Sequence, residues 1–74
     1  MSRLATTYHI KAPYAESYKL ITHIRSIHNK GVLKKIGHEG SEDGFTYCNI
    51  YLKPHSKYIE WAHENLKSLG LVAI

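Results

Sequence analysis

The aromatic residues of the stretch 44–52 are the first candidates for chemistry in this chain. Read as a β-strand, this stretch puts Phe45, Tyr47 and Tyr51 on one face and Cys48 among aliphatic residues on the other, because successive side chains alternate. Rings on an open sheet face can stack on nucleic-acid bases at about 1–3 kcal/mol each, while nearby cations attract the phosphates. The same rings could instead pack against a loop, a protein partner or a second copy of the chain.

Basic side chains dominate the first half of the sequence. The chain has ten Lys and Arg against six Asp and Glu, which gives a formal charge of +4, and Glu16 is the only acid in residues 1–36. An excess of this kind favours anionic partners. Combined with the rings, it predicts a nucleic-acid-binding or partner-binding site composed of Phe45, Tyr47, Tyr51, His9, Lys11, Lys34, Lys35 and Arg3.

Catalytic and metal-binding patterns are not found in the sequence. No two of the six histidines have the i, i+4 helical spacing of paired ligands, and no cysteine pair accompanies them. We interpret them as solvated histidines or histidines at the margin of the core. Cys48 is expected to point inward, and no serine has the glycine elbow of a nucleophile. We therefore expect no enzyme activity, no cofactor and no metal.

Length and composition indicate one domain, spanning residues 1–74. This length provides one sheet and two helices, and the single cysteine excludes an internal disulfide. The first residues lack the apolar block of a secretory signal, and no stretch approaches the roughly 20 apolar residues of a membrane span. We expect a cytoplasmic protein with no membrane partner.

The first half of the chain predicts a strand followed by a helix. Residues 4–11 alternate, with Leu4, Tyr8 and Ile10 expected inward, and Pro13 ends the strand. Residues 14–29 predict an amphipathic helix that ends at Gly31. Its inward stripe consists of Tyr14, Leu20, Ile21, Ile24 and Ile27.

The second half predicts a hairpin and a second helix. Residues 32–36 are a short edge-strand candidate, residues 37–44 a mobile loop, and residues 44–52 the strand that pairs back. Ser56 is the expected N-cap of a helix that continues to about Leu69 and ends at Gly70. Its inward residues are Tyr58, Ile59, Ala62, Leu66 and Leu69. Residues 71–74 form either a last short strand or an apolar tail.

The order of these elements predicts the fold class. An α+β fold, ferredoxin-like with the order β-α-β-β-α(-β), has an antiparallel sheet with two helices on one face. The first and third strands lie side by side at its centre. The face away from the helices would then present His9 and Lys11 beside Phe45, Tyr47 and Tyr51.

Residues 43–50 resemble the third-strand octamer of an RNA-recognition motif domain, whose third and fifth residues stack on bases. Gly44, Phe45 and Tyr47 match the octamer, whereas Asp43 stands where the family has a basic residue and Thr46 where it has a small one. The resemblance implies RNA or single-stranded nucleic-acid binding, which we take as the leading hypothesis. The alternative is a protein-binding inhibitor or adaptor, for example a phage-encoded blocker of a host or defence protein. It would dock on an acidic partner or form a homodimer.

Overall fold

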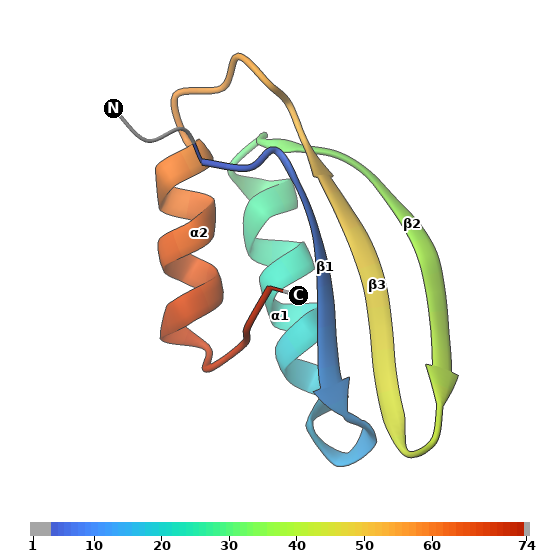
Figure 1. Ribbon diagram of the computed structural model, residues 1–74. Coiled ribbons are helices and arrows are strands. Elements are labelled where there is room, and N and C mark those ends of the chain that lie inside the picture. Colours follow the sequence, from blue (N-terminus) through green and yellow to red (C-terminus); the bar gives the residue numbers. More distant parts are fainter. Residues whose placement is uncertain (1–3, 74) are drawn as a thin grey trace.

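The computed structural model describes residues 4–73, which form an α+β fold (Figure 1). A three-stranded antiparallel sheet has the order β1-β3-β2, so β3 lies in the middle. The α+β class and the adjacent first and third strands are therefore confirmed. In chain order the elements are β1 (Thr7–Pro13), the short 3-10 helix η1 (Tyr14–Glu16), α1 (Ser17–Asn29), β2 (Leu33–Glu42), β3 (Phe45–Leu52) and α2 (Ile59–Ser68).

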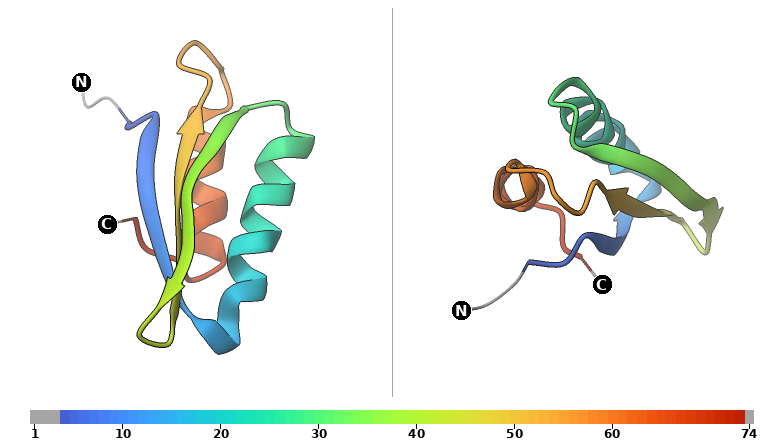
Figure 2. Two further views of the ribbon diagram at one scale, coloured as in Figure 1. Left: turned by 90° about the vertical axis from the view of Figure 1, so that its right-hand side faces the viewer. Right: turned by 90° about the horizontal axis from the view of Figure 1, so that it is seen from above.

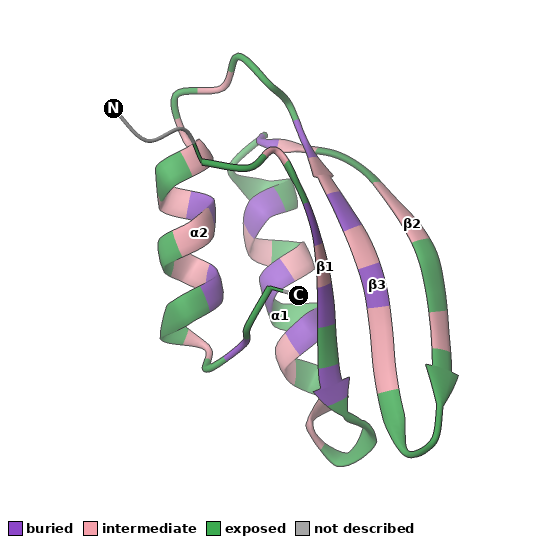
Figure 3. Ribbon diagram, in the orientation of Figure 1, coloured by how far each residue is buried: buried purple, intermediate pink, exposed green. Residues whose placement is uncertain are grey.

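Buried and more exposed side chains alternate along β1 and β3, so the sheet has one buried face. Tyr8 pairs with Ile50 and Ile10 pairs with Cys48, and all four side chains lie in the core. Figure 3 shows the buried positions recurring at every second residue of both strands. The predicted phase of residues 44–52 is thus correct.

Both helices cover this buried face (Figure 2). Leu20 and Ile27 of α1 and Ala62 and Leu66 of α2 are buried in one cluster with the inward residues of β1 and β3. The predicted stripe of α2 is confirmed.

The predicted stripe of α1 is wrong at two positions. Ile21 is 54% exposed and Tyr14 is 64% exposed. Tyr14 belongs to η1 rather than to α1, so it does not continue the phase of the α-helix. Ile21 lies on the outer side of α1, next to the strip of Leu20 and Ile24 that packs on the sheet.

The prediction of a mobile loop at residues 37–44 is wrong. Strand β2 continues to Glu42 and pairs with β3, so only Asp43 and Gly44 form the turn. Both turn residues have positive φ angles, 53° and 80°, as in the two-residue turns that match the twist of a hairpin. Register shifts after Leu33 and after Gly37 absorb the extra residues of the strand.

The helices end where the glycines predict. At the end of α1, the N–H of Gly31 donates to the carbonyl of His28 and the N–H of Val32 to that of Ile27, a Schellman motif. The end of α2 has the same two bonds at Gly70 and Leu71. Val32 and Leu71 are buried, so each motif also turns an apolar residue into the core.

The beginnings of β1 and α2 differ from the prediction. Strand β1 begins at Thr7, and Leu4 is exposed rather than inward. Ser56 does not cap α2, because its hydroxyl accepts a hydrogen bond from the N–H of Tyr58, one residue before the helix. The turn around Ser56 therefore delays the helix by a few residues.

The last described residues return to the sheet. Ala73 forms an isolated antiparallel bridge with Ile10 of β1, instead of a complete fourth strand. Residues 1–3, with the candidate Arg3, and residue 74 lie outside the described part of the chain. Within residues 4–73, no helix has the length and apolar character that crossing a membrane requires.

Candidate nucleic-acid interface

The face of the sheet opposite the helices carries the predicted aromatic residues. We call it the open face. Phe45 is 37% exposed, and Tyr47 and Tyr51 are half-buried beside neighbouring strands. Because Cys48 and Ile50 fill the helix-covered side of β3, these three rings must lie on the other side. The open face therefore presents three rings along a single central strand.

Lysine side chains from both flanking strands lie against two of the rings. The Nζ atom of Lys11 in β1 is 4.5 Å from the centroid of the Phe45 ring. The Nζ atom of Lys35 in β2 is 4.9 Å from the centroid of the Tyr51 ring. Such contacts contribute about 0.5–1 kcal/mol each at exposed sites. They place a positive charge beside the rings at each end of β3.

The middle of the open face is polar. The ring of His9 lies 5.8 Å from that of Tyr47, between centroids. Its Nδ1–H donates to the side-chain oxygen of Asn49 at 2.5 Å, across the β1–β3 pair. This hydrogen bond orients the imidazole and leaves its Nε2 atom available to a ligand.

Two glycines of β2 make room for the tyrosine rings. A Cβ atom at Gly40 would lie 2.6 Å from the hydroxyl oxygen of Tyr47. A Cβ atom at Gly37 would lie 3.2 Å from Cε2 of Tyr51. The rings therefore rest on bare backbone, which explains why they are half-buried on a face that no helix covers. Each ring has one side on the sheet, and the Lys35 ammonium group and the His9 ring are the neighbours of Tyr51 and Tyr47 on the open face.

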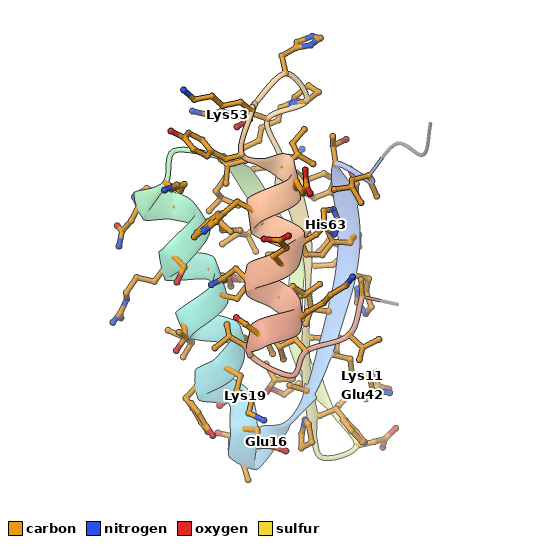
Figure 4. All side chains as sticks on the ribbon, turned by 90° about the vertical axis from the view of Figure 1, so that its left-hand side faces the viewer. Lys11, Glu16, Lys19, Glu42, Lys53 and His63 are labelled. Carbon is orange, nitrogen blue, oxygen red and sulfur yellow. The ribbon has the colours of Figure 1, made fainter. Side chains whose placement is uncertain are left out.

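The charge of the open face changes sign along its length. At the hairpin end, Glu42 and Asp43 line a shallow hollow of about 360 Å³ together with His9, Lys11 and Tyr47. Lys35 lies toward the other end, and Lys53 directly follows β3 there. Figure 4 shows Lys11 and Glu42 at one end of the molecule and Lys53 at the opposite end.

The structure brings most of the predicted site residues together. His9, Lys11, Lys35, Phe45, Tyr47 and Tyr51 share the open face. Lys34 is exposed but lies in the bulge between Leu33 and Lys35, where it interrupts the pairing with β3. Arg3 falls outside the described residues.

Sequence reasoning missed Asn49 and a second basic cluster. Asn49 was visible on the predicted outer face, but only strand pairing reveals its bond to His9. The second cluster combines Lys53, His55 and Lys57 of the β3–α2 loop with Lys30 after α1. The two lysines and one histidine within residues 53–57 were a usable signal, whereas the addition of Lys30 depends on the fold.

One histidine departs from the prediction of a solvated or marginal position. His23 is fully buried between Tyr8 and Asn65, to which its two ring nitrogens are hydrogen-bonded. Across residues 4–73, no three His, Cys, Asp or Glu side chains gather as metal ligands would.

Comparison with known proteins adds no relative. No protein-family model, curated protein sequence or solved structure matches this chain. The function is therefore inferred from the geometry of the open face.

Proposed function

We propose that this chain is a ferredoxin-like protein that binds RNA or another single-stranded nucleic acid on its open face. The observation that carries the proposal is the row of Phe45, Tyr47 and Tyr51 on the sheet face that neither helix covers. Unpaired bases stack on such rings with little sequence preference, since every base has a π-face. A duplex hides those faces, so the expected ligand is single-stranded.

The element order supports the ferredoxin-like assignment. The chain runs β1-α1-β2-β3-α2, and β3 lies between β1 and β2 and antiparallel to both. The bridge between Ile10 and Ala73 adds the last described residues to the free edge of β1, where a fourth strand would belong. In the RNA-recognition motif, which this fold resembles, the same face of the sheet binds RNA.

The charges suggest how a strand lies on the face. Glu42 and Asp43 repel phosphates at the hairpin end, whereas Lys35 attracts them toward the other end. Bases stack along β3, and the phosphate backbone leaves the face near Tyr51. Among the described residues the one ion pair joins Lys19 to Glu16, so neither Lys11 nor Lys35 is held in a salt bridge, although Glu42 and Asp43 line the same hollow as Lys11.

Binding of fluorescent oligonucleotides measures this function directly. Single-stranded RNA, single-stranded DNA and duplex DNA are titrated with the protein at two salt concentrations. We expect single strands to bind best, with affinity that falls as salt rises, because phosphate contacts release counterions. Tyr47→Ala should weaken binding about 5- to 150-fold, the equivalent of about 1–3 kcal/mol for one lost stack.

Tyr18→Ala is the matched control, because Tyr18 is an exposed tyrosine, 61% accessible, on the helical side of the molecule. It should leave affinity unchanged, as should Glu60→Ala on α2. Equal effects of Tyr47→Ala and Tyr18→Ala, or no binding by the wild-type protein, would refute the proposal.

A second candidate function is protein binding, and the outer side of α1 supports it. Ile21 is exposed there and, with Ile24, Leu33 and Ile36, lines an apolar groove between α1 and β2. Arg25 and His28 flank the groove, as does Glu39. A groove with both positive and negative groups suits a second copy of this chain. In a two-fold dimer the same groove of both copies meets in reversed direction, so the basic groups of one copy can face the acidic group of the other.

Light scattering after size exclusion decides this second candidate. A homodimer gives twice the monomer mass, and Ile21→Asp should return it to the monomer by adding a charge to the apolar groove. Ile21→Asp should not affect oligonucleotide binding, because Ile21 is on the opposite layer from the open face. A monomeric wild-type protein would exclude the homodimer.

A further inference from the structure

A shallow basic cleft lies beyond the end of β3, at the opposite end of the sheet from the hairpin turn. It has a volume of about 370 Å³ and is formed by the end of α1 and the β3–α2 loop. None of the described residues that line it is acidic. Its lining residues are Lys30, Gly31, Lys53, Pro54, His55, Ser56, Lys57 and Tyr58.

Aromatic contacts hold two of the cleft lysines in place. The Nζ atom of Lys30 is 4.9 Å from the ring centroid of Tyr58 and 5.2 Å from that of Trp61. The Nζ atom of Lys57 is 5.4 Å from the ring centroid of the same Tyr58. Two ammonium groups thus lie against one ring, which concentrates positive charge at this end of the sheet. A bound anion would be attracted by both.

The loop that carries Lys53 and Lys57 is ordered by its own hydrogen bonds. The N–H of Ser56 donates to the carbonyl of Lys53, and the N–H of Tyr58 donates to the hydroxyl of Ser56. The N–H of Lys53 donates to the carbonyl of Val32, which extends the β2–β3 ladder into the loop. The cleft is therefore attached directly to the sheet that bears the rings.

We infer that this cleft binds backbone phosphates of the same nucleic-acid strand that stacks on the open face. The inference rests on the proposed function. A strand that leaves the face near Tyr51 and Lys35 meets Lys53 next, because Lys53 follows β3 without an intervening loop. The acidic hairpin end offers no comparable exit.

The chemistry of the cleft selects phosphates rather than bases. Three lysines line the cleft and Tyr58 is the one tyrosine among its described lining residues, so charge rather than stacking dominates there. Lysine acts on a phosphate as a point charge and carries no base information. The cleft therefore adds affinity that depends on strand length and salt but not on sequence.

Oligonucleotides of two lengths test this inference. A strand of about 4 nucleotides is expected to cover the open face alone, and one of about 12 to reach the cleft. Lys53→Gln/Lys57→Gln should weaken binding of the longer strand about 10-fold and reduce its salt slope by about 1.4, since each lost phosphate contact changes the slope by about 0.7. Binding of the shorter strand should not change.

Lys19→Gln/Lys67→Gln is the matched control, because it removes the same charge from the helical side. Equal weakening of the longer strand by the two double variants would overturn the inference. Tyr47→Ala should weaken both strands, so loss of stacking and loss of the cleft give different results.

Titration with inorganic pyrophosphate separates the two proposals. The amide NMR signals of Gly31 and of residues 53–58 should shift in the wild-type protein and not in Lys53→Gln/Lys57→Gln. If these signals do not move, the cleft is not an anion site and the inference is wrong, even where oligonucleotides bind. If they move but no oligonucleotide binds, the proposed function fails and the inferred nucleic-acid ligand fails with it, leaving an anion site alone.

Discussion

The hydroxyl oxygen of Tyr8 lies 2.6 Å from Nε2 of His23 inside the core. The other ring nitrogen, Nδ1, lies 2.8 Å from the side-chain oxygen of Asn65. An amide oxygen can only accept, so Nδ1 carries the hydrogen and Nε2 accepts from the tyrosine hydroxyl. The neutral ring therefore satisfies both partners and joins β1, α1 and α2.

Acid should destabilise the protein through His23. Burial, and to a lesser extent the nearby His63, lowers the pKa of His23 below its usual 6.5, although the bond to Asn65 opposes this. Below about pH 6.5 the imidazole of His23 therefore binds a proton in the unfolded chain but not in the folded one. This contribution to the free energy of unfolding is complete above about pH 6.5 and is lost as pH falls below it. Urea unfolding followed by Trp61 fluorescence, at about pH 7.5 and pH 5, measures the loss.

His23→Leu should remove most of that pH dependence. It should also cost about 1–3 kcal/mol at neutral pH, because the buried Tyr8 hydroxyl loses its acceptor. His55→Leu is the control, since His55 is exposed in the β3–α2 loop. If His23→Leu retained the full acid sensitivity of the wild type, the assigned role of His23 would be wrong.

Gly40→Ala should destabilise the hairpin by about 1–3 kcal/mol, because the new methyl group overlaps the Tyr47 ring. In a Tyr47→Ala background the overlap is gone. The same change should then be neutral or stabilising by about 0.5–1 kcal/mol, since alanine suits a strand better than glycine. A double-mutant cycle of unfolding free energies gives the coupling. Equal costs in both backgrounds would contradict the packing of Tyr47 on Gly40.

Gly44→Ala should cost about 1–2 kcal/mol through backbone conformation alone. The φ angle of Gly44 is 80°, and a Cβ atom there would have no neighbour within 4 Å. Chemical synthesis with D-alanine at this position should restore or raise the stability, because D-residues favour positive φ. Thermal unfolding of the two peptides compares them directly, and identical stabilities would argue against the two-residue turn.

Cys48 should resist alkylation in the folded protein. Burial, with a smaller effect of Glu39, raises the pKa of its thiol from 9.0 to about 11. At about pH 8 the reactive thiolate is then about 100-fold rarer than in the unfolded chain. Mass spectrometry after iodoacetamide treatment should show slow labelling that accelerates in urea. Rapid labelling under native conditions would show that Cys48 is accessible.

Local pattern predicted much of the layer structure. The alternation of residues 44–52 correctly assigned Cys48 and Ile50 to the helices and the rings to the opposite face, because a strand leaves no other choice. The glycines at positions 31 and 70 correctly marked the helix ends. The sequence did not predict the full length of β2. Its lysines, glycines and two register shifts break the alternating pattern of a strand, and its pairing with β3 is visible only in the structure.

Composition and local periodicity are thus enough for the α+β class, the phase of the central strand and the excess of positive charge. Which distant residues meet depends on the packing of the elements. Tyr8, His23 and Asn65 are far apart in the chain, and Lys30 reaches the 53–57 loop only because α1 ends beside it. Periodicity describes the side chains of a single helix or strand. These contacts form only when helices and strands pack, because a buried side chain needs neighbours from other elements.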